Sequence, residues 1–534
     1  MQKYLSYPWQ LRNILEQGLP EHKCTCVNYA QGGAVVIGSK VSAVCSVSGV
    51  KLARRIIWWR GDCYSLFEFP GPAENGDSSR NEKVHIEDEQ QNNVAAVEVA
   101  YSSNAKNTGA ACFDALLNAA YYLRSKVLKS DAARAPVQYL SDMLEQFLKY
   151  VDDDPARQAS IVDLSHELPV HMEKITNQPK RALKRVREME RIQRVREIDK
   201  ACLVNLARRP GITVAEKAGP RQRILAVRRQ ETCDTLENRV ARHCCRLIRR
   251  SADHYLSFHY YVNTKDSHRK KEVEVFQRKA IKWAASEVFQ GVAGLSVPCK
   301  SPNFALLQNP HYARIWKAYV TLVKNEEIRA SVWRWQRQLW RDLAVVGFSK
   351  LVYQWIESLN AGVKIPVAQD CVVSGTRRFS QGRFINSDSL PGPYIIGESN
   401  GQTGTLYIVD NVGLERLYPQ HANLPLMLAD IYLIWEGETQ RKVIPVYCQL
   451  FDLDLSAEES MKKGYSAVVN LVPFYPEFDG VLIIRPGLDN SELNASLAPV
   501  TRKWVWDVKL SINPSGWIFH DEFINSSPIK WLIR

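Results

Sequence analysis

The sequence predicts an α+β protein of several domains, because strand-like and helix-like patterns occupy different stretches of the chain. Short β-forming runs dominate residues 1–105, helical periodicity dominates residues 106–330, and strands with flanking helices return over residues 331–534. We therefore expect a β-rich N-terminal domain (1–105), a helical, strongly basic middle region (106–330) and a C-terminal α/β domain (331–534). A chain of 534 residues is also too long for one hydrophobic core.

In the N-terminal region, runs of β-branched, aromatic and small residues predict strands. These runs cover residues 34–37, 41–47, 56–59 and 94–101. The polar stretch 71–93 contains Pro, Gly, Ser and Gln, and it is predicted to be a long loop.

Cysteines in the same region raise the question of a metal site. His22, Cys24 and Cys26 form an HxCxC cluster, and Cys45 and Cys63 follow. Zinc sites usually contain two CxxC-like pairs, and this spacing differs from that pattern. We interpret these residues as buried or half-buried thiols and expect no metal. The irregular spacing of all 12 cysteines favours reduced thiols in a cytoplasmic protein over a secreted disulfide framework.

Amphipathic periodicity predicts the helices of the middle region and one helix that runs into the C-terminal region. They cover residues 112–127, 138–151, 171–200, 232–250, 272–290, 311–325 and 328–359. The helix expected over 171–200 is broken only near Gln178-Pro179 and is charged around most of its circumference. Such a helix bridges other elements or contacts a partner.

Short apolar runs predict the strands of the C-terminal region. They cover residues 394–396, 405–409, 431–435, 443–450 and 481–484, and a helix is expected over 456–471.

The positive charge is concentrated in one segment. Between Lys180 and Arg250 there are 21 Lys and Arg against 8 Asp and Glu, and the rest of the chain holds 49 of each sign. Such a segment attracts a polyanion, most often nucleic acid, although a solvated helix face or a stalk against another subunit is the alternative. The residues expected to contact DNA are Arg181, Lys184, Arg185, Arg187, Arg191, Arg194, Arg239, Arg242 and Arg246.

The sequence lacks the motifs of several classes of enzyme and nucleotide-binding protein. The sequence contains no GxxxxGK[ST] loop, no HExxH and no GxSxG, so we expect no Walker-type nucleotide site, zincin site or α/β-hydrolase nucleophile. No apolar run approaches the roughly 18–20 residues of a membrane helix, and the first residues lack the apolar segment of a signal peptide. We expect a cytoplasmic protein that does not engage a membrane.

The most distinctive short string is Asp234-Thr235-Leu236-Glu237-Asn238-Arg239. Asp234 or Thr235 is expected to cap a helix, and Glu237 stands three residues after Asp234, as in a capping box. A capped amphipathic helix accounts for the cap and the apolar stripe, but not for five arginines in the helix that follows.

Together with other short runs in the same order, this DTxENR string resembles the McrC-like proteins of prokaryotic restriction and defence loci. The other runs are Arg196–Asp199, Ala207–Gly211, Asn309–Tyr312, Leu351–Trp355, Ala429–Leu433, Met461–Tyr465 and Ile484–Gly487. The resemblance spans about residues 190–490. It implies an N-terminal region that meets an AAA+ NTPase and a C-terminal PD-(D/E)xK nuclease domain.

A PD-(D/E)xK nuclease holds its metal with carboxylates and uses a lysine to position water. At the positions that the resemblance assigns, Gln354 replaces the helix Glu, and Asp430 is retained. The next strand offers Pro445 and Tyr447 in one register, or Tyr447 and Gln449 in the other. Neither register supplies a carboxylate and a lysine, and a lone carboxylate binds Mg²⁺ poorly. We therefore expect a degenerate nuclease domain without catalytic residues or a metal cofactor.

Three functions follow from these observations. The first is a non-catalytic DNA-binding or scaffolding subunit of an antiviral defence complex that resembles McrBC. The second is a metal-dependent DNA endonuclease, with Mg²⁺ as cofactor and carboxylates in another register. The third is an activator of a partner AAA+ NTPase, in which an arginine of residues 181–250 reaches the nucleotide site. The expected partners are DNA and other subunits of the defence system.

Overall fold

The chain folds as an α+β protein, as the sequence predicts. The structure, a computed structural model, describes residues 3–5, 25–29, 32–37, 43–47, 50–52, 54–59, 62–68, 82–88, 93–99, 113, 116–117, 120, 160–262, 267–295, 297–345, 394–399, 402–409, 429–437, 441–449, 456–472, 478–487 and 492–511. It divides into two compact units. Unit 1 comprises residues 1–158, 257–265 and 327–534, and unit 2 comprises residues 159–256 and 266–326.

The N-terminal part of unit 1 contains two sheets. The first has the strand order β1-β2-β3-β7-β6 and the second has the order β5-β4-β8-β9. Their strands are β1 (Lys3–Leu5), β2 (Thr25–Tyr29), β3 (Gly32–Ile37), β4 (Ala43–Val47), β5 (Val50–Lys51), β6 (Arg54–Trp59), β7 (Asp62–Glu68), β8 (Glu82–Asp88) and β9 (Asn93–Val99). The strands predicted over 34–37, 41–47, 56–59 and 94–101 correspond to β3, β4, β6 and β9.

The prediction of a continuous loop over residues 71–93 is wrong, because β8 lies within it. This strand pairs with both β4 and β9. Its apolar residues Val84 and Ile86 alternate with charged and polar ones, which is a strand pattern. The abundance of polar residues around them hid that alternation.

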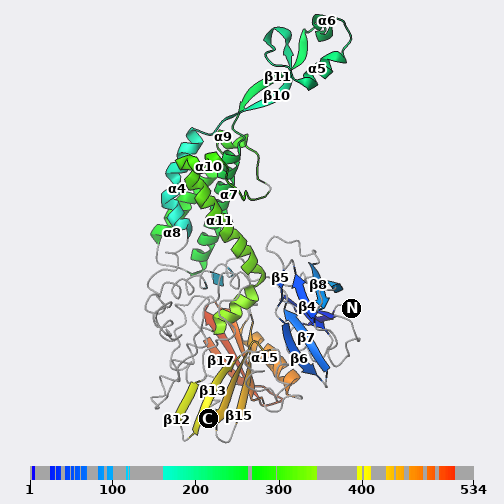
Figure 1. The fold of residues 1–534 in the computed structure, drawn as a ribbon. Helices are drawn as coiled ribbons and strands as arrows, with labels where there is room; N and C mark the ends of the chain where they lie inside the picture. Colours follow the sequence, from blue (N-terminus) through cyan, green and yellow to red (C-terminus); the bar gives the residue numbers. More distant parts are fainter. Residues whose placement is uncertain are drawn as a thin grey trace. The chain divides into compact units, whose positions relative to one another are not determined.

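The body of unit 2 is helical (Figure 1). Its helices are α4 (Ser160–Asn177), α7 (Leu236–Val262), α8 (Ser267–Ala284), α9 (Glu287–Gln290), α10 (Phe304–Gln308) and α11 (Pro310–Arg334). Val240, Cys244 and Ile248 on α7 are fully buried, as are Phe276 on α8 and Ile315 on α11. The spacing of four residues on α7 places its buried side chains on one face, which explains why this helix was predictable.

Other predicted helices are only partly described. The described residues of the helix expected over 112–127 are helical, and so are residues 336–345 within the helix expected over 328–359. The helix expected over 138–151 and the remainder of 328–359, with Gln354, lie outside the described residues.

The helix predicted over residues 171–200 is wrong beyond Asn177. Pro179 disfavours helical backbone at the residue before it, and the chain then forms β10 (Ala182–Arg191). This strand pairs antiparallel with β11 (Arg223–Thr232), from Ala182↔Thr232 to Arg191↔Arg223. Leu, Lys, Arg, Glu and Met favour helices, but pairing with residues 32 to 50 positions further along the chain overrides that local preference.

The C-terminal part of unit 1 is a seven-stranded mixed sheet with the order β12-β13-β14-β15-β16-β18-β17. Its elements are β12 (Tyr394–Ser399), β13 (Gln402–Val409), β14 (Ile431–Gly437), β15 (Arg441–Cys448), α15 (Ala457–Leu471), β16 (Gly480–Gly487), β17 (Glu492–Leu497) and β18 (Trp504–Ser511). The helix expected over 456–471 and all five expected strands are present. The sequence reading missed β17 and β18.

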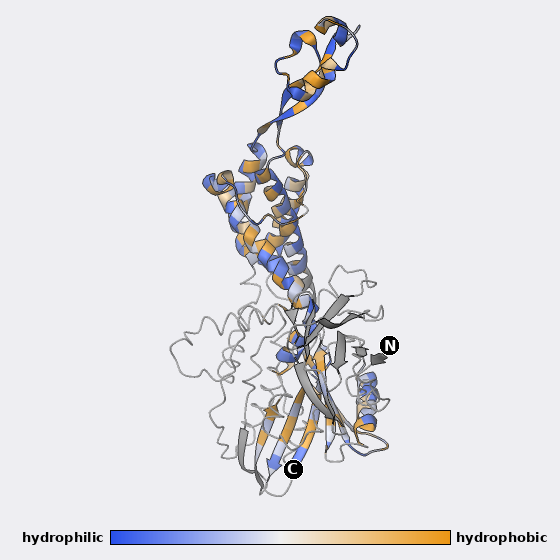
Figure 2. Ribbon diagram, turned by 45° about the vertical axis from the view of Figure 1, so that its right-hand side comes forward, coloured by the Kyte–Doolittle hydropathy of each residue, from blue (hydrophilic) through white to orange (hydrophobic). Residues whose placement is uncertain are grey.

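The hydrophobic core of this domain lies at the centre of the sheet. Every residue of β16 is buried, and β16 lies between the parallel strands β15 and β18. Helix α15 packs on β16 and β18, and the Cα of Gly464 lies so close to Val505 that a side chain there would collide with it. In Figure 2 the inner strands carry the hydrophobic colour.

Candidate nucleic-acid interface

The strongly basic segment forms one structural feature, the arm, which we define as residues 180–232. It consists of β10, a short 3-10 turn (Ile192–Arg194), α5 (Lys200–Ala207), α6 (Val214–Ala218) and β11. The paired strands are ten residues long, which corresponds to roughly 30 Å of ribbon, and α5 and α6 lie at its far end (Figure 1). The arm holds 16 Lys and Arg against 6 Asp and Glu.

Several predicted DNA-contacting arginines of the arm are held in ion pairs. Arg181 pairs with Glu231 at 3.0 Å, and Arg187 pairs with Asp199 at 2.7 Å. Arg185 pairs with Glu197. These arginine side chains are more than half exposed, so the pairs contribute little to stability and leave part of each guanidinium accessible.

Asp199 caps a helix and also binds an arginine of the ribbon. Its Oδ1 accepts a hydrogen bond from the backbone N–H of Cys202 at 3.0 Å and so caps α5, while its Oδ2 accepts from Arg187. The Arg187 hydrogen bond, followed by the Cys202 amide, holds the pKa of Asp199 well below its usual range. Arg187 therefore contacts the start of α5 from the ribbon.

A cleft of about 950 Å³ lies at the far end of the ribbon. Its lining residues are Arg191, Ile192, Gln193, Val214, Ala215, Pro220, Arg221, Gln222 and Arg223. Within the part of the chain that the structure describes, the guanidinium groups of Arg191, Arg221 and Arg223 form no ion pair. Arg191 was predicted from the sequence, but Arg221 and Arg223 were not, because the strand register places Arg223 opposite Arg191 and the turn before β11 adds Arg221 to the same cleft.

The remaining predicted residues are dispersed. Lys184 lies on β10 and Arg194 ends the 3-10 turn, and both are exposed. Arg239, Arg242 and Arg246 lie on α7, outside the arm. Arg246 is exposed, whereas Arg239 and Arg242 make internal contacts.

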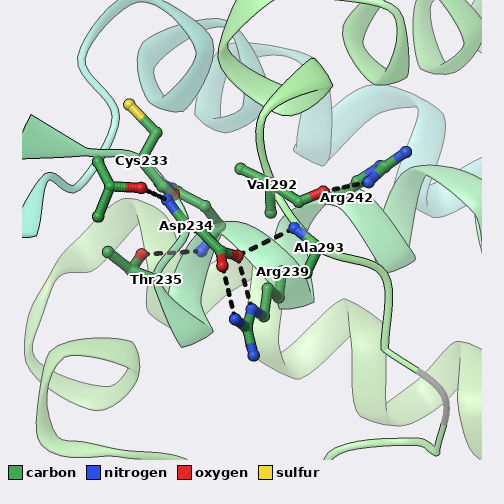
Figure 3. A network of polar contacts seen from close by, with 9 residues as sticks. Cys233, Asp234, Thr235, Arg239, Arg242, Val292 and Ala293 are labelled. Atoms are coloured by element: carbon green, nitrogen blue, oxygen red, sulfur yellow. Dashed lines mark hydrogen bonds and ion pairs between the residues drawn. The ribbon is translucent and has the colours of Figure 1, made fainter. Parts of the chain in front are cut away.

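The DTxENR string ties α7 to a neighbouring loop (Figure 3). Both carboxylate oxygens of Asp234 accept hydrogen bonds from Arg239, at 2.7 and 2.6 Å, and Oδ1 also accepts from the backbone N–H of Ala293 at 2.9 Å. The Arg239 hydrogen bonds lower the pKa of Asp234 to about 2. Arg242 donates to the carbonyl oxygen of Val292 in the same loop. Arg239 and Arg242 therefore have structural partners.

The cap of α7 differs in part from the prediction. Thr235 is the capping residue, since its hydroxyl accepts from the backbone N–H of Asn238. Asp234 does not cap the helix. The capping-box pattern predicts that the Glu237 side chain accepts a hydrogen bond from the start of the helix. Instead, Glu237 is buried and accepts from the Asn303 side chain at 3.1 Å.

Asn238 holds both ends of the arm. Its side-chain amide donates to the carbonyl oxygens of Lys180 at 2.8 Å and Cys233 at 2.7 Å, which flank the paired strands. Its Oδ1 accepts from the Tyr312 hydroxyl at 2.6 Å, and that hydroxyl accepts from the Lys180 backbone N–H. Burial raises the pKa of Tyr312 to about 12, so the hydroxyl stays protonated.

Comparison of the sequence with known protein families gives a match in this same region. Residues 156–319 match the model of a family described as a domain of unknown function, DUF2357. No curated protein matches the chain. The matched DUF2357 region contains the arm, the DTxENR string and the helices α4 to α10, so the arm and its anchoring contacts lie within the matched residues.

In the C-terminal sheet, the predicted degenerate positions share one face. Ile431 pairs with Val446 and Tyr432 with Pro445, so Asp430 lies on the same side as Pro445, Tyr447 and Gln449. All four of the described degenerate positions are buried. They contribute one carboxylate and no lysine.

Asp430 is satisfied by groups of the chain itself. Its Oδ2 accepts from the backbone N–H of Cys448 at 2.8 Å, and Arg337 lies 3.7 Å from Oδ1. Arg341 and Asp342 form a second buried pair at 3.4 Å, and burial together with the Asp430 charge raises the pKa of Cys448. Arg337, Arg341 and Asp342 lie on a helix and were not predicted from the sequence. The basic groups balance both carboxylates, which disfavours a divalent cation.

Two features are absent from the described residues. No group of three or more His, Cys, Asp or Glu side chains there could hold a metal ion. No helix there is long and apolar enough to cross a membrane. The side chains of the HxCxC cluster lie outside the residues that the structure describes.

Proposed function

We propose that this chain is a non-catalytic DNA-binding and scaffolding subunit of a prokaryotic antiviral defence complex that resembles McrBC. The arm carries the proposal, because it concentrates 16 Lys and Arg on a two-stranded ribbon and its end. A surface of this charge attracts a phosphate backbone. Gln230, a side chain that could read bases, is engaged by Glu188 at 2.7 Å, which favours contact through phosphates.

The C-terminal domain supports a non-catalytic role in the same proposal. Asp430 is paired within the chain, and Tyr447 and Gln449 supply neither a second carboxylate nor a lysine. We infer that this domain binds duplex DNA or docks another subunit of the defence system. In this proposal the complex acts in the cytoplasm, and this chain needs neither a membrane contact nor a cofactor.

The test is DNA binding by the full chain at several salt concentrations. Affinity for a labelled duplex is expected to fall by about 10³-fold or more between 50 and 200 mM salt, as for proteins that contact several phosphates. The double reversal Lys184→Glu/Arg196→Glu on the arm should weaken binding. The matched reversal Lys282→Glu/Lys317→Glu, on exposed helix positions of unit 2, should not. Binding that is insensitive to salt, or equal losses in both variants, contradicts the proposal.

A second candidate, activation of a partner AAA+ NTPase, is favoured by apolar residues on the arm. Ile212 is 95% exposed, Leu203 55% and Val214 50%. Exposed apolar side chains suit a protein partner better than a phosphate backbone. This function predicts that Ile212→Ser lowers stimulation of the partner's nucleotide hydrolysis while DNA affinity is unchanged. The remaining candidate, a metal-dependent endonuclease, predicts that the purified chain cuts DNA in Mg²⁺ or Mn²⁺.

A further inference from the structure

Two pairs of arginines lie directly opposite each other on one face of the ribbon. The register places Arg185 opposite Arg229 and Arg191 opposite Arg223. Side chains opposite each other in an antiparallel pair have Cβ atoms about 4.5–5.5 Å apart, and like charges at that spacing destabilise the sheet. An anion between the two guanidinium groups of a pair offsets this repulsion.

The chain supplies that anion for the first pair. The carboxylate of Glu197 contacts Arg185 and accepts from Nε of Arg229 at 3.1 Å. The position of Glu197 is fixed by the ribbon, since its carbonyl oxygen accepts from the backbone N–H of Val227 at 2.9 Å. One internal carboxylate thus bridges two opposed guanidinium groups.

The second pair has no such carboxylate among the described residues. Arg191 and Arg223 line the cleft at the end of the ribbon, and Arg221 adds a third positive group. Two acidic side chains near this end are engaged by backbone amides. Glu190 accepts from the N–H of Arg191 at 3.3 Å, and Glu216 accepts from the N–H of Ile212 at 2.8 Å.

The backbone between Arg221 and Arg223 is held in an uncommon conformation. Gln222 has a φ of 45°, in the left-handed region that non-glycine residues seldom adopt. Its side-chain amide donates to the carbonyl oxygens of Ala215 at 3.2 Å and Gly219 at 3.0 Å, and its own carbonyl accepts from the N–H of Ile192 at 3.0 Å. These bonds join three walls of the cleft, so the arginines project from a fixed frame.

We propose that Arg191, Arg221 and Arg223 clamp one phosphate group of bound DNA. The phosphate occupies, between Arg191 and Arg223, the place that the Glu197 carboxylate occupies between the first pair. Guanidinium groups suit this ligand because they donate two parallel hydrogen bonds to phosphate oxygens. That the phosphate belongs to DNA rests on the proposed function. The clamp itself rests on the strand register and the lining of the cleft.

The experiment compares two variants that remove the same charge from the same face of the ribbon. Arg191→Gln/Arg223→Gln opens the proposed clamp, and Arg185→Gln/Arg229→Gln removes the internally bridged pair. In the clamp variant, affinity for a labelled duplex is expected to fall about tenfold or more, and the slope of log affinity against log salt to lose about one contact. In the matched variant, affinity is expected to fall as well, because part of each guanidinium is accessible to DNA, but by less than in the clamp variant, because Glu197 already engages both arginines.

A second measurement separates the clamp from DNA binding. Melting temperature is recorded in inorganic phosphate and in chloride at equal ionic strength, since a ligand that binds only the folded state raises it. Phosphate should stabilise the wild type and the matched variant, but not the clamp variant. If the wild type binds no DNA but shows this phosphate effect, the proposed function fails and the clamp stands. Equal losses in both variants, or no difference between phosphate and chloride for the wild type, overturn the clamp.

Discussion

At the scale of single residues, Asn238 links the arm to the helices of unit 2. The residue is completely buried, and its side chain satisfies two carbonyl oxygens and one hydroxyl. An amide suits this position because it donates twice and accepts once, as the three partners require. Neither Asp nor Leu offers that combination.

Asn238→Ala is expected to lower the free energy of unfolding by about 3 kcal/mol, because it leaves buried polar partners unsatisfied. Asn205→Ala, on the exposed side of α5, is the matched control and should change stability little. Chemical denaturation of both variants gives the measurement. Equal stability of the two variants would show that the contacts at the base of the arm are not stabilising.

Asp234 predicts a dependence of stability on acid pH. Arg239, and then the Ala293 amide, lower its pKa to about 2 in the folded chain. The unfolded value is about 3.9, so the folded state gains stability above about pH 4. That gain is lost as the pH falls through the folded pKa.

Asp234→Asn should therefore be less stable than the wild type at pH 6, and the difference should shrink as the pH falls from about 4 to about 2. Asp163→Asn, at an exposed position of α4, serves as the control. Denaturation midpoints across this range give the measurement. A constant difference between wild type and Asp234→Asn would contradict the assigned ion pair.

At the scale of elements, α4 and α11 meet through two histidines. The Nδ1 atoms of His171 and His311 are 3.0 Å apart, so one ring donates and the other accepts. Burial, and then the neighbouring His311 and Arg314, lower the pKa of His171. The contact therefore favours a neutral His171.

The sign of the pH effect follows from that shift. Above the unfolded pKa of about 6.5, both states carry a neutral ring; below it, the unfolded state binds the proton first and stability is lost. The melting temperature of the wild type should fall more between pH 7 and pH 5 than that of His171→Gln. His268→Gln is the control, since the His268 side chain is 83% exposed. If His171→Gln follows the wild type across this range, His171 does not titrate as stated.

At the scale of the whole molecule, the chain combines a basic arm with a sheet whose buried charges are balanced internally. In that sheet, Arg485 and Asp507 form a buried ion pair at 3.0 Å, and Ser460 donates to the same carboxylate. Asp430 is likewise paired with Arg337. Carboxylates that arginines already engage in this way are poor metal ligands.

The purified full chain is expected to cut neither supercoiled nor linear DNA in Mg²⁺ or Mn²⁺. Asp430→Asn, which keeps a hydrogen-bond acceptor for the Cys448 amide, should behave identically. Agarose electrophoresis of the products provides the measurement. Nicking by the wild type that Asp430→Asn abolishes would favour the endonuclease function.

The sequence by itself determined the α+β class, the strands β12 to β16 with α15, and the position of the basic segment. These features depend on local patterns: apolar runs of strand length, a capped helix, and a surplus of Lys and Arg within one stretch. The DTxENR string was also visible as a distinctive local pattern, although its partners were not.

Only the tertiary structure decided what the basic segment forms and which arginines are available. Residues 182–191 have a helical composition, yet they pair with residues 223–232, and the register alone places Arg191 opposite Arg223. Arg239 and Arg242 resemble exposed arginines in the sequence but bond to Asp234 and Val292. Pairing and ion-pair partners depend on contacts between residues distant in sequence, and local propensity carries no information about those contacts.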